Sequence, residues 1–445
     1  MQTINQLRSG LLAGSKQIKL CCGLSEVPAE LFDLSETLEV LDLSGNQLSS
    51  LPPEFASLRH LRILFLSDNE FVEFPEVLGQ CVSLDIVGFK ANRIENIAEH
   101  ALPVGLRWLI LTNNRISKLP KSIGRCSKLQ KVMLAGNQLR ELPQEMASCR
   151  RLELLRISAN QFEEVPSWLY AMPRLAWLAL AGNPATNLNQ PKNVLQEILW
   201  NDCTLEQTLG EGASGVISKA VWHDGSISRD VAVKLFKGEI TSDGSPNDEM
   251  TACVAAGVHE NLVPLIGMIT HHPEKKQGLV FKLIDPDNKN LGGPPDFITC
   301  TRDTFSQDQR FTLTEIITIA SGIASAMVHL HERGIMHGDL YAHNILINKV
   351  AHPLLGDFGA AMLYGGANSF TAHALEKLEV RAFSCMLDDL LLRISHHNYS
   401  TAVFSELIEL QKNCSTELVE VRPDFKEIDR RTKAIAQGYP KDTID

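Results

Sequence analysis

A glycine cluster in residues 204–222 has the spacing of a loop that binds phosphate groups. The stretch TLEQTLGEGASGVISKAVW places Gly210, Gly212 and Gly215 in a GxGxxG pattern between two strand-like segments. Glycine lets backbone amides come close to phosphate oxygens, because no Cβ stands in the way. A dinucleotide-binding loop has the same spacing but opens a helix, whereas β-branched residues and a further strand follow here. The sequence therefore favours a hairpin that covers bound phosphates.

Four polar residues suited to phosphate and metal chemistry follow this loop. Lys234 lies in VAVKLF, Asp339 and Asn344 lie in HGDLYAHNIL, and Asp357 opens the triplet DFG. Glycine loop, strand lysine, HxD…N and DFG stand in the order and at the spacing found in protein kinases. On these motifs, residues 204–436 resemble the eukaryotic-type protein kinase fold.

The resemblance implies a role for each polar residue in phosphoryl transfer, which depends on positioning and on offsetting the developing negative charge. Lys234 would position the α- and β-phosphates of ATP, and Asp339 would accept or orient the proton of the substrate hydroxyl. Asp357 would bind Mg²⁺ between the β- and γ-phosphates, and Asn344 would hold a second metal site. Since all four residues are present, an active protein kinase that uses ATP and Mg²⁺ is expected.

The resemblance also implies a set of residues around the nucleotide. Lys234 needs a carboxylate partner, for which the next helix offers Glu249, with Asp248 as second choice. Phe281 would lie behind the adenine, and the backbone of the hinge that follows would hydrogen-bond it. The full predicted set is Gly210, Glu211, Gly212, Ala213, Ser214, Gly215, Val216, Ala232, Lys234, Glu249, Phe281, Lys282, Leu283 and Ile284.

Three residues of HGDLYAHNIL depart from the kinase pattern. Gly338 replaces the arginine that receives a phosphorylated activation segment. Tyr341 replaces the lysine that helps to neutralise the γ-phosphate in Ser/Thr kinases, and His343 replaces an arginine that tyrosine kinases use instead. A histidine is only partly protonated near pH 7, so a modest turnover is expected. The acceptor type stays open, with Ser/Thr as the default.

Two late motifs extend the resemblance. AHALEKLEV stands where kinases have APE, and VRPDFKEI resembles their RPxF motif. The resemblance implies a pair between Arg422 and Glu376, and it puts Glu379 where an aspartate usually anchors the catalytic loop. Two other functions remain open: a scaffold that binds nucleotide without transfer, and a small-molecule kinase, since HGD loops also occur there.

A repeat of 22–23 residues dominates the first half of the chain. LEVLDLSGNQLSSLP (38–52) is the first of seven copies, and LAWLALAGNPATNL (175–188) is the last. The pattern resembles the leucine-rich repeat, LxxLxLxxNxL, and predicts an α/β solenoid of about seven repeats plus caps. Its asparagines should be structural, because their amides can satisfy backbone groups that the turns leave unpaired. They are Asn46, Asn69, Asn92, Asn114, Asn137, Asn160 and Asn183.

Strand residues that alternate with the inward leucines should face the concave side of the solenoid. Large apolar groups mixed with cations favour a binding surface for a protein substrate or regulator over a merely solvated face. These residues are Phe65, Lys90, Trp108, Ile110, Lys131, Met133, Arg156 and Trp177.

The expected organisation is a repeat domain in 1–188, a short linker in 189–203, and an α+β bilobal protein-kinase-like domain in 204–440. The net charge is −11, and residues 1–200 hold 20 basic and 20 acidic side chains, so the acidic excess lies in the second half. This argues against nucleic acid as a partner.

Ten cysteines without CxxC spacing suggest free thiols. We expect a cytoplasmic protein with no membrane span and no signal peptide, while the oligomeric state is not indicated.

Overall fold

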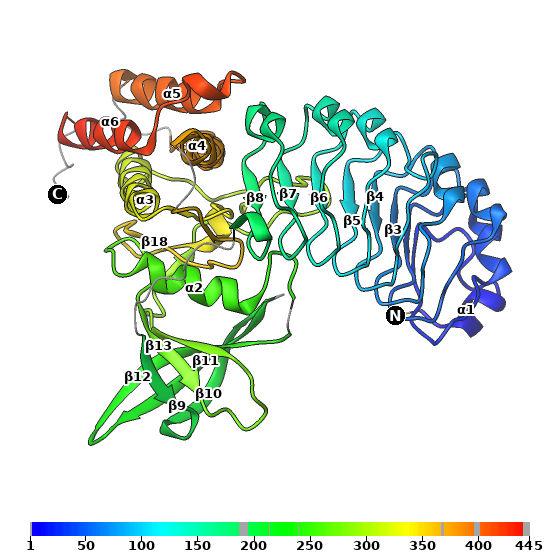
Figure 1. Cartoon of the computed structure of the whole chain (residues 1–445), viewed down its shortest axis with the longest axis horizontal. Helices are drawn as coiled ribbons and strands as arrows, with labels where there is room; N and C mark the ends of the chain where they lie inside the picture. Colours follow the sequence, from blue (N-terminus) through cyan, green and yellow to red (C-terminus); the bar gives the residue numbers. More distant parts are fainter. Residues whose placement is uncertain are drawn as a thin grey trace. The chain divides into compact units, whose positions relative to one another are not determined.

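The chain forms two compact units, each described by itself (Figure 1). The first comprises Met1–Leu175 and Asn183–Ala185, and the second comprises Ala176–Gly182 and Thr186–Asp445. The strand of the seventh repeat therefore groups with the second unit by its contacts. The computed structural model describes residues 2–186, 195–212, 214–238, 240–365, 369–395 and 401–438.

The first unit is built from short parallel strands, one per repeat, which confirms the predicted solenoid. Successive strands place equivalent residues side by side. The middle residue of each strand, from Leu41 to Leu155, is fully buried, so the stacked repeats share one apolar core. The elements are α1 (Ile4–Arg8), β1 (Gln17–Lys19), β2 (Val40–Asp42), β3 (Ile63–Phe65), β4 (Ile86–Gly88), β5 (Trp108–Ile110), β6 (Lys131–Met133) and β7 (Leu154–Arg156).

The return segment of most repeats is a single 3-10 turn that begins after a proline. Proline fixes φ near its helical value and cannot donate a hydrogen bond, which suits the position before a helix. These turns are η1 (Ala29–Leu34), η2 (Pro53–Ser57), η3 (Glu76–Gln80), η4 (Lys121–Arg125), η5 (Gln144–Ser148) and η6 (Ser167–Ala171).

The repeat asparagines are buried and bridge neighbouring repeats, as expected for a structural role. Asn114 is representative. Its side-chain nitrogen donates to the carbonyls of Phe89, at 2.9 Å, and Leu111, at 3.0 Å. Its side-chain oxygen accepts from the amide of Ile94 at 3.0 Å. One side chain thus satisfies backbone groups of two repeats.

Replacing Asn114 with alanine should destabilise the repeats. The change leaves buried backbone donors and acceptors unpaired, at a cost of about 1–3 kcal/mol for each group left unsatisfied. Urea unfolding followed by circular dichroism should show a lower midpoint. Asn96→Ala is the matched control, because Asn96 is exposed and its side chain donates to the exposed Glu73 carboxylate rather than to buried backbone. An equal loss in both variants would contradict the role of the buried asparagine.

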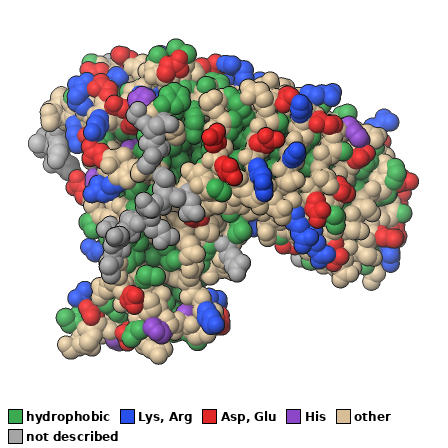
Figure 2. All heavy atoms as spheres, viewed as in Figure 1, with side chains coloured by type: hydrophobic (Ala, Val, Ile, Leu, Met, Phe, Trp, Pro, Cys, Tyr) green, Lys and Arg blue, Asp and Glu red, His purple; other side chains and the backbone are tan. Residues whose placement is uncertain are grey.

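Two rows of side chains flank the buried middle residues of the strands. In one, Trp108 of β5 lies beside Lys131 of β6, whose Nζ sits 4.1 Å from the centre of the indole ring. In the other, Ile110 lies beside Met133. All four are partly accessible. On the face seen in Figure 2, basic and acidic side chains alternate over the repeats, in keeping with their equal numbers.

The structure corrects part of the predicted concave set. Lys90 follows β4 and lies on a turn, because that strand ends at Gly88. Arg156 is buried, with 3% of its surface accessible, so it does not present a solvated cation. Trp177 is also buried, and its indole contacts Leu340 and Tyr341 of the second unit.

The second unit contains a six-stranded sheet in the order β10-β11-β12-β14-β13-β9. Its pairings from β10 to β13 are antiparallel, and the hairpins β10–β11 and β11–β12 are the longest of them. The strands are β9 (Gln196–Leu199), β10 (Cys203–Glu211), β11 (Gly215–Asp224), β12 (Ile227–Phe236), β13 (Leu265–Thr270) and β14 (Gly278–Lys282).

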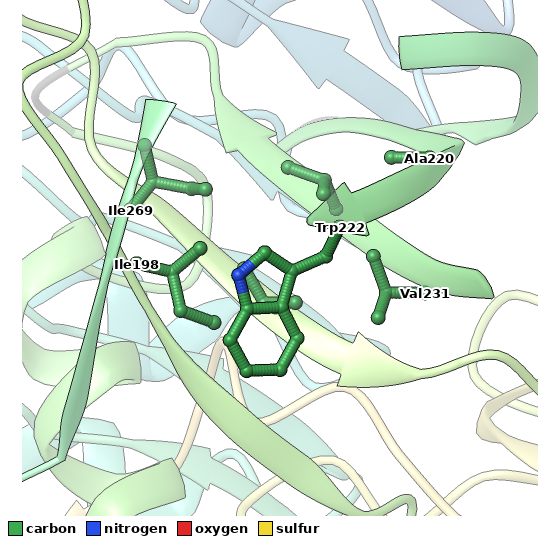
Figure 3. Packing of buried hydrophobic residues seen from close by; sticks show 7 residues of the cluster. Ile198, Ala220, Trp222, Val231 and Ile269 are labelled. Carbon is green, nitrogen blue, oxygen red and sulfur yellow. The ribbon is translucent and has the colours of Figure 1, made fainter. Parts of the chain in front are cut away.

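Part of the range predicted as linker forms an edge strand of this sheet. β9 pairs in parallel with β13, with Ile198 opposite Ile269. Ile198 packs with Trp222 and other buried residues of the sheet (Figure 3). An apolar residue that becomes fully buried contributes about 1.5–3 kcal/mol, which ties this segment to the sheet.

The rest of the second unit is mainly helical. Helix α3 begins with a capping box between Thr312 and Glu315, and its apolar positions are buried. By length and composition alone α3 could cross a membrane, but 56% of its most apolar window is buried inside the unit, where it packs on α6. The helices are α2 (Pro246–Ala256), α3 (Leu313–Glu332), α4 (Ser369–Leu391), α5 (Thr401–Ser415) and α6 (Phe425–Gly438).

Short strands complete this part. They are β8 (Trp177–Ala179), β15 (Lys289–Asn290), β16 (Ile335–Met336), β17 (Ile345–Ile347), β18 (Pro353–Leu355) and β19 (Met362–Leu363). β17 pairs with β15 and β18, and β16 pairs with β19. The β16–β19 and β17–β18 pairings hold the segments on either side of residues 337–344, which we call the catalytic loop, and of the DFG triplet.

Candidate active site

A cleft of about 860 Å³ opens between the six-stranded sheet and the catalytic loop. Strands β10, β11 and β12 contribute one wall, α2 contributes the back, and β17 and the DFG triplet contribute the floor. The predicted residues that line it are Gly210, Ala232, Lys234, Glu249, Phe281, Lys282, Leu283, Ile284, Asn344 and Asp357. The motifs chosen from the sequence thus converge on one cavity.

Lys234 and Glu249 form a buried ion pair at the back of the cleft. Lys234 Nζ lies 2.5 Å from Glu249 Oε1, and 5% and 3% of the two residues are exposed. Burial raises the pKa of Glu249 to about 7, although the ammonium opposes this shift. Burial lowers the pKa of Lys234, but Asp357 and Glu249 outweigh it and raise that pKa. The lysine therefore stays charged and fixed in place.

Asp248, the second choice for this partner, has a different task. It is in the first turn of α2, where the Ser245 side chain accepts from its amide and donates to its carboxylate at 2.6 Å. A carboxylate here also complements the positive end of the helix dipole. The helix then turns Glu249, one residue later, toward Lys234.

Asp357 extends the charged cluster into the open part of the cleft. Its Oδ1 is 3.6 Å from Lys234 Nζ, and 49% of its side chain is accessible. Desolvation by the surrounding protein would raise the pKa of Asp357, but Lys234 and the amide of Gly359 hold it below its ordinary value. Its backbone has φ of 53°, which turns the carboxylate toward the lysine. Asp357 is therefore an ionised, accessible carboxylate.

Asp339 and Asn344 are joined within the catalytic loop. The Asn344 side-chain nitrogen donates to Asp339 Oδ2 at 2.8 Å and to the Asp339 carbonyl at 3.0 Å. The imidazole of His337 accepts from the Asp339 amide at 3.3 Å, and its other nitrogen meets the Gly356 carbonyl at 3.0 Å. These bonds tie the loop to the segment before DFG and set the direction of the Asp339 carboxylate.

Glu379 anchors the catalytic loop from helix α4. Its carboxylate accepts from the amides of His337, at 3.1 Å, and Gly338, at 2.7 Å. Only 1% of Glu379 is exposed. The extra methylene relative to aspartate is thus accommodated, as the resemblance implied for this position.

His343 has a pKa above the ordinary histidine value, so its imidazole carries more positive charge than its residue type suggested. Its Nδ1 is 2.6 Å from Asp303 Oδ1, and it lines the cleft. Burial would lower the pKa of His343, but the hydrogen bond to Asp303 and the charges of Asp339 and Asp357 raise it above its ordinary value. Sequence reasoning missed Asp303, because nothing local marks a residue 40 positions away as a partner.

The glycine hairpin holds the remaining predicted nucleotide residues. Gly215 needs to be glycine, since a Cβ there would lie 2.4 Å from the Leu235 carbonyl oxygen. Glu211 pairs with Lys237, Gly212 donates to the Gly215 carbonyl, and Ser214 accepts from the Lys237 amide. Ala213 lies outside the described residues.

Val216 does not line the cleft, and neither do Glu211, Gly212, Ser214 and Gly215, whereas Ile217 does. Ile217 lies directly opposite Lys234 across β11 and β12, so both side chains are on the cleft face of the sheet. Finding it requires the register of the β11–β12 hairpin as well as strand alternation, and residue patterns alone do not give that register. Leu209 and Leu346 also line the cleft and were missed, since apolar pocket walls carry no motif of their own.

Arg422 and Glu376 connect the predicted segments through main-chain hydrogen bonds. Arg422 donates to the Lys377 carbonyl at 2.9 Å, and Glu376 accepts from the Phe425 amide at 2.8 Å. Lys377, which the sequence did not single out, donates to the Arg422 carbonyl. Helix α4 and the start of α6 are joined through these backbone groups, and the predicted pair between Arg422 and Glu376 is corrected, because each side chain bonds to main-chain atoms instead.

The side chains present fit ATP and Mg²⁺. Mg²⁺ takes oxygen ligands and is commonly held by one or two carboxylates together with substrate phosphates. Asp357 and Asn344 both line the cleft and offer such oxygens. Among the described residues no cluster of three or more His, Cys, Asp or Glu could hold a metal ion.

A glycine hairpin, a buried lysine–glutamate pair, an Asp–Asn loop and a DFG carboxylate around one cleft define a protein kinase domain. A family model described as protein tyrosine and serine/threonine kinase matches residues 203–385, and one described as leucine rich repeat matches 20–71 and 104–162. The chain thus carries N-terminal leucine-rich repeats and a C-terminal protein kinase domain.

Curated relatives include both serine/threonine and tyrosine kinases. Probable serine/threonine-protein kinase gdt4 of Dictyostelium discoideum is 27% identical over 249 residues, covering 55% of this chain and 14% of that protein. Tyrosine-protein kinase ABL2 of Mus musculus is 30% identical over 42% of this chain and 14% of its own length. The G-type lectin S-receptor-like serine/threonine-protein kinase B120 of Arabidopsis thaliana is 31% identical over 38% of this chain and 19% of its own length. The chain matches less than a quarter of each relative.

Proposed function

We propose that the protein is an ATP-dependent protein kinase that transfers the γ-phosphate to protein hydroxyls, serine or threonine by default. The observation that carries this proposal is the buried Lys234–Glu249 pair with Asp357 3.6 Å from the same ammonium. A buried charged cluster is costly unless its charges are compensated, and here it faces a cleft of nucleotide size. Kinase relatives of both acceptor classes support the general activity.

Each residue acts through position and charge. Lys234 would hold phosphate oxygens, and Glu249 would keep the ammonium aimed at them. Bound Mg²⁺ would supply positive charge against the phosphates, with Asp357 and Asn344 as its protein ligands. Asp339 would accept the proton of the acceptor hydroxyl, since Asn344 and His337 fix its carboxylate and backbone. His343 would add positive charge at the cleft, raised in pKa by Asp303.

A transfer assay tests this proposal. The purified chain is incubated with γ-labelled ATP and casein, and mass spectrometry identifies the phosphorylated residues. Phosphoserine or phosphothreonine on the chain or on casein is the expected product. Nucleotide binding without transfer would instead support a scaffold.

One observation favours the scaffold as the second candidate. Tyr341 occupies the place of a γ-phosphate lysine, and its ring is stacked on Trp177 at 4.3 Å between centres. It therefore cannot bring a charge to the phosphate. His343, however, lies in the same loop and offers the missing cation, which favours transfer.

We propose further that the repeats recruit a protein substrate or regulator through the accessible face formed by Trp108, Ile110, Lys131 and Met133. Lys131→Glu should reverse the charge at the centre of this face and place a carboxylate against an electron-rich indole. Retention of binding proteins on the immobilised chain should fall severalfold. Lys121→Glu, in the exposed turn η4, is the matched control. Equal retention by wild type and Lys131→Glu would remove this face from consideration.

A further inference from the structure

The strand Trp177–Ala179 packs against the catalytic loop within the second unit. The indole of Trp177 is stacked on the phenol ring of Tyr341, with ring centres 4.3 Å apart and planes within 5° of parallel. The indole Nε1 donates to the Leu340 carbonyl at 3.0 Å. Trp177 is 1% exposed. One side chain thus contacts the two residues that follow Asp339.

Two of the three departures of this loop from the kinase pattern, Gly338 and Tyr341, face that strand. A Cβ on Gly338 would lie 2.7 Å from the Leu178 carbonyl oxygen and 2.5 Å from that of Ala360. Gly338 also has φ of +74°, which side chains other than glycine rarely adopt. An arginine at this position would displace the strand, and a lysine in place of Tyr341 would lose the ring stack.

The stack continues toward the cleft. The Tyr341 ring lies 5.0 Å from the centre of the His343 imidazole, whose Nδ1 lies 2.6 Å from Asp303 Oδ1. Asp303 also accepts from the Ala342 amide at 2.6 Å. Trp177, Tyr341 and His343 therefore form a column that runs from β8 to the wall of the cleft.

We propose that Trp177 is a positioning residue for phosphoryl transfer, which fixes the main chain next to Asp339 and the imidazole of His343. The inference rests on the proposed kinase activity and adds a specific requirement to it. Glu379 holds the start of the loop and Asp303 holds its end, whereas Trp177 binds the carbonyl between them. The catalytic unit of this chain therefore begins with the strand of the seventh repeat.

Trp177→Ala and Trp177→Phe test the proposal in the full chain. The alanine variant should lower kcat for transfer from ATP to casein about tenfold or more, because displacement of a catalytic group by about 1 Å has effects of this size. KM for ATP should change by less than about twofold, since Trp177 does not line the cleft. Phenylalanine keeps the stack and loses only the hydrogen bond, so it should recover most of the activity.

Amide hydrogen exchange of residues 337–344, measured without nucleotide, gives a readout independent of catalysis. Exchange in this segment should accelerate in Trp177→Ala and remain near wild type in Trp177→Phe. Trp168→Ala is the control for loss of a partly buried tryptophan, because Trp168 lies in turn η6 of the first unit. If wild type shows no transfer, the proposed function fails, and exchange still decides whether Trp177 orders the loop.

Two results would overturn the inference. One is unchanged kcat and unchanged exchange in Trp177→Ala. The other is a parallel loss of kcat, ATP affinity and melting temperature that phenylalanine does not recover, which would make Trp177 a general packing residue.

Discussion

Asp339→Asn should reduce phosphoryl transfer by about 10²–10⁴-fold, the usual contribution of a positioned general base. Asparagine has the same shape as aspartate but cannot take up the proton of the acceptor hydroxyl. Its side-chain oxygen can still accept from Asn344 Nδ2, which lies 2.8 Å from Asp339 Oδ2 in the wild type. The loop should therefore keep its conformation, and kcat should fall while the affinity for ATP stays within about twofold.

The control for this substitution is Asp308→Asn, an exposed aspartate in the same unit. It changes the net charge equally and should leave kcat unchanged. Melting temperature and ATP affinity are measured for both variants, so that unfolding and lost binding are separated from lost chemistry. Full transfer by Asp339→Asn in a preparation free of other kinases would exclude Asp339 as the base.

The polar part of the site could be predicted from the sequence because its spacing along the chain is restricted by the fold. A lysine in a central strand needs a carboxylate from the next helix, and the helix offered only Asp248 and Glu249. The glycines of the hairpin and the Asp339–Asn344 pair are likewise local in sequence. The repeat asparagines are predictable for the same reason, since each bonds to backbone at fixed sequence distances.

Contacts between distant segments could not be predicted from residue patterns. Trp177 occupies the same repeat position as Trp108, so strand alternation assigns both to the concave face. Only the three-dimensional packing shows that one indole is buried on Tyr341, which is far away in sequence. Asp303 and Ile217 were missed for related reasons. A carboxylate in a loop has many possible partners, and an apolar wall residue is identified by the strand opposite it.

Lys234→Met should abolish transfer, with a loss of about a hundredfold or more, because one preorganised charge toward the phosphates is removed. The same substitution leaves Glu249 buried without the ammonium that lies 2.5 Å away in the wild type. Breaking a buried pair in this way costs about 3–5 kcal/mol when the remaining group stays charged. The variant can lower this cost by protonating Glu249, so its stability should depend on pH.

The direction of that dependence follows from the pKa of Glu249, which burial raises to about 7 from an ordinary value of 4.5. A carboxyl group whose pKa is raised on folding stabilises the folded state in its protonated form. This contribution is complete below the ordinary pKa and is lost as pH rises toward the folded pKa. Methionine removes the Lys234 charge that opposes the shift, so the window extends to higher pH in the variant.

Urea unfolding at pH 6 and pH 8.5 measures this effect. The free energy of unfolding of Lys234→Met should fall further below that of wild type at pH 8.5 than at pH 6, by up to about 1.4 kcal/mol for each pH unit in the titration range. Adding Glu249→Gln removes the titrating group, so the double variant should regain stability at pH 8.5 and lose the pH dependence, while transfer stays absent.

Lys276→Met breaks the exposed pair with Glu274 and should change stability little at either pH, because exposed ion pairs contribute about 0–1 kcal/mol. A Lys234→Met variant whose stability loss is equal at both pH values would contradict the account of Glu249 as a buried carboxyl that depends on Lys234 for its charge.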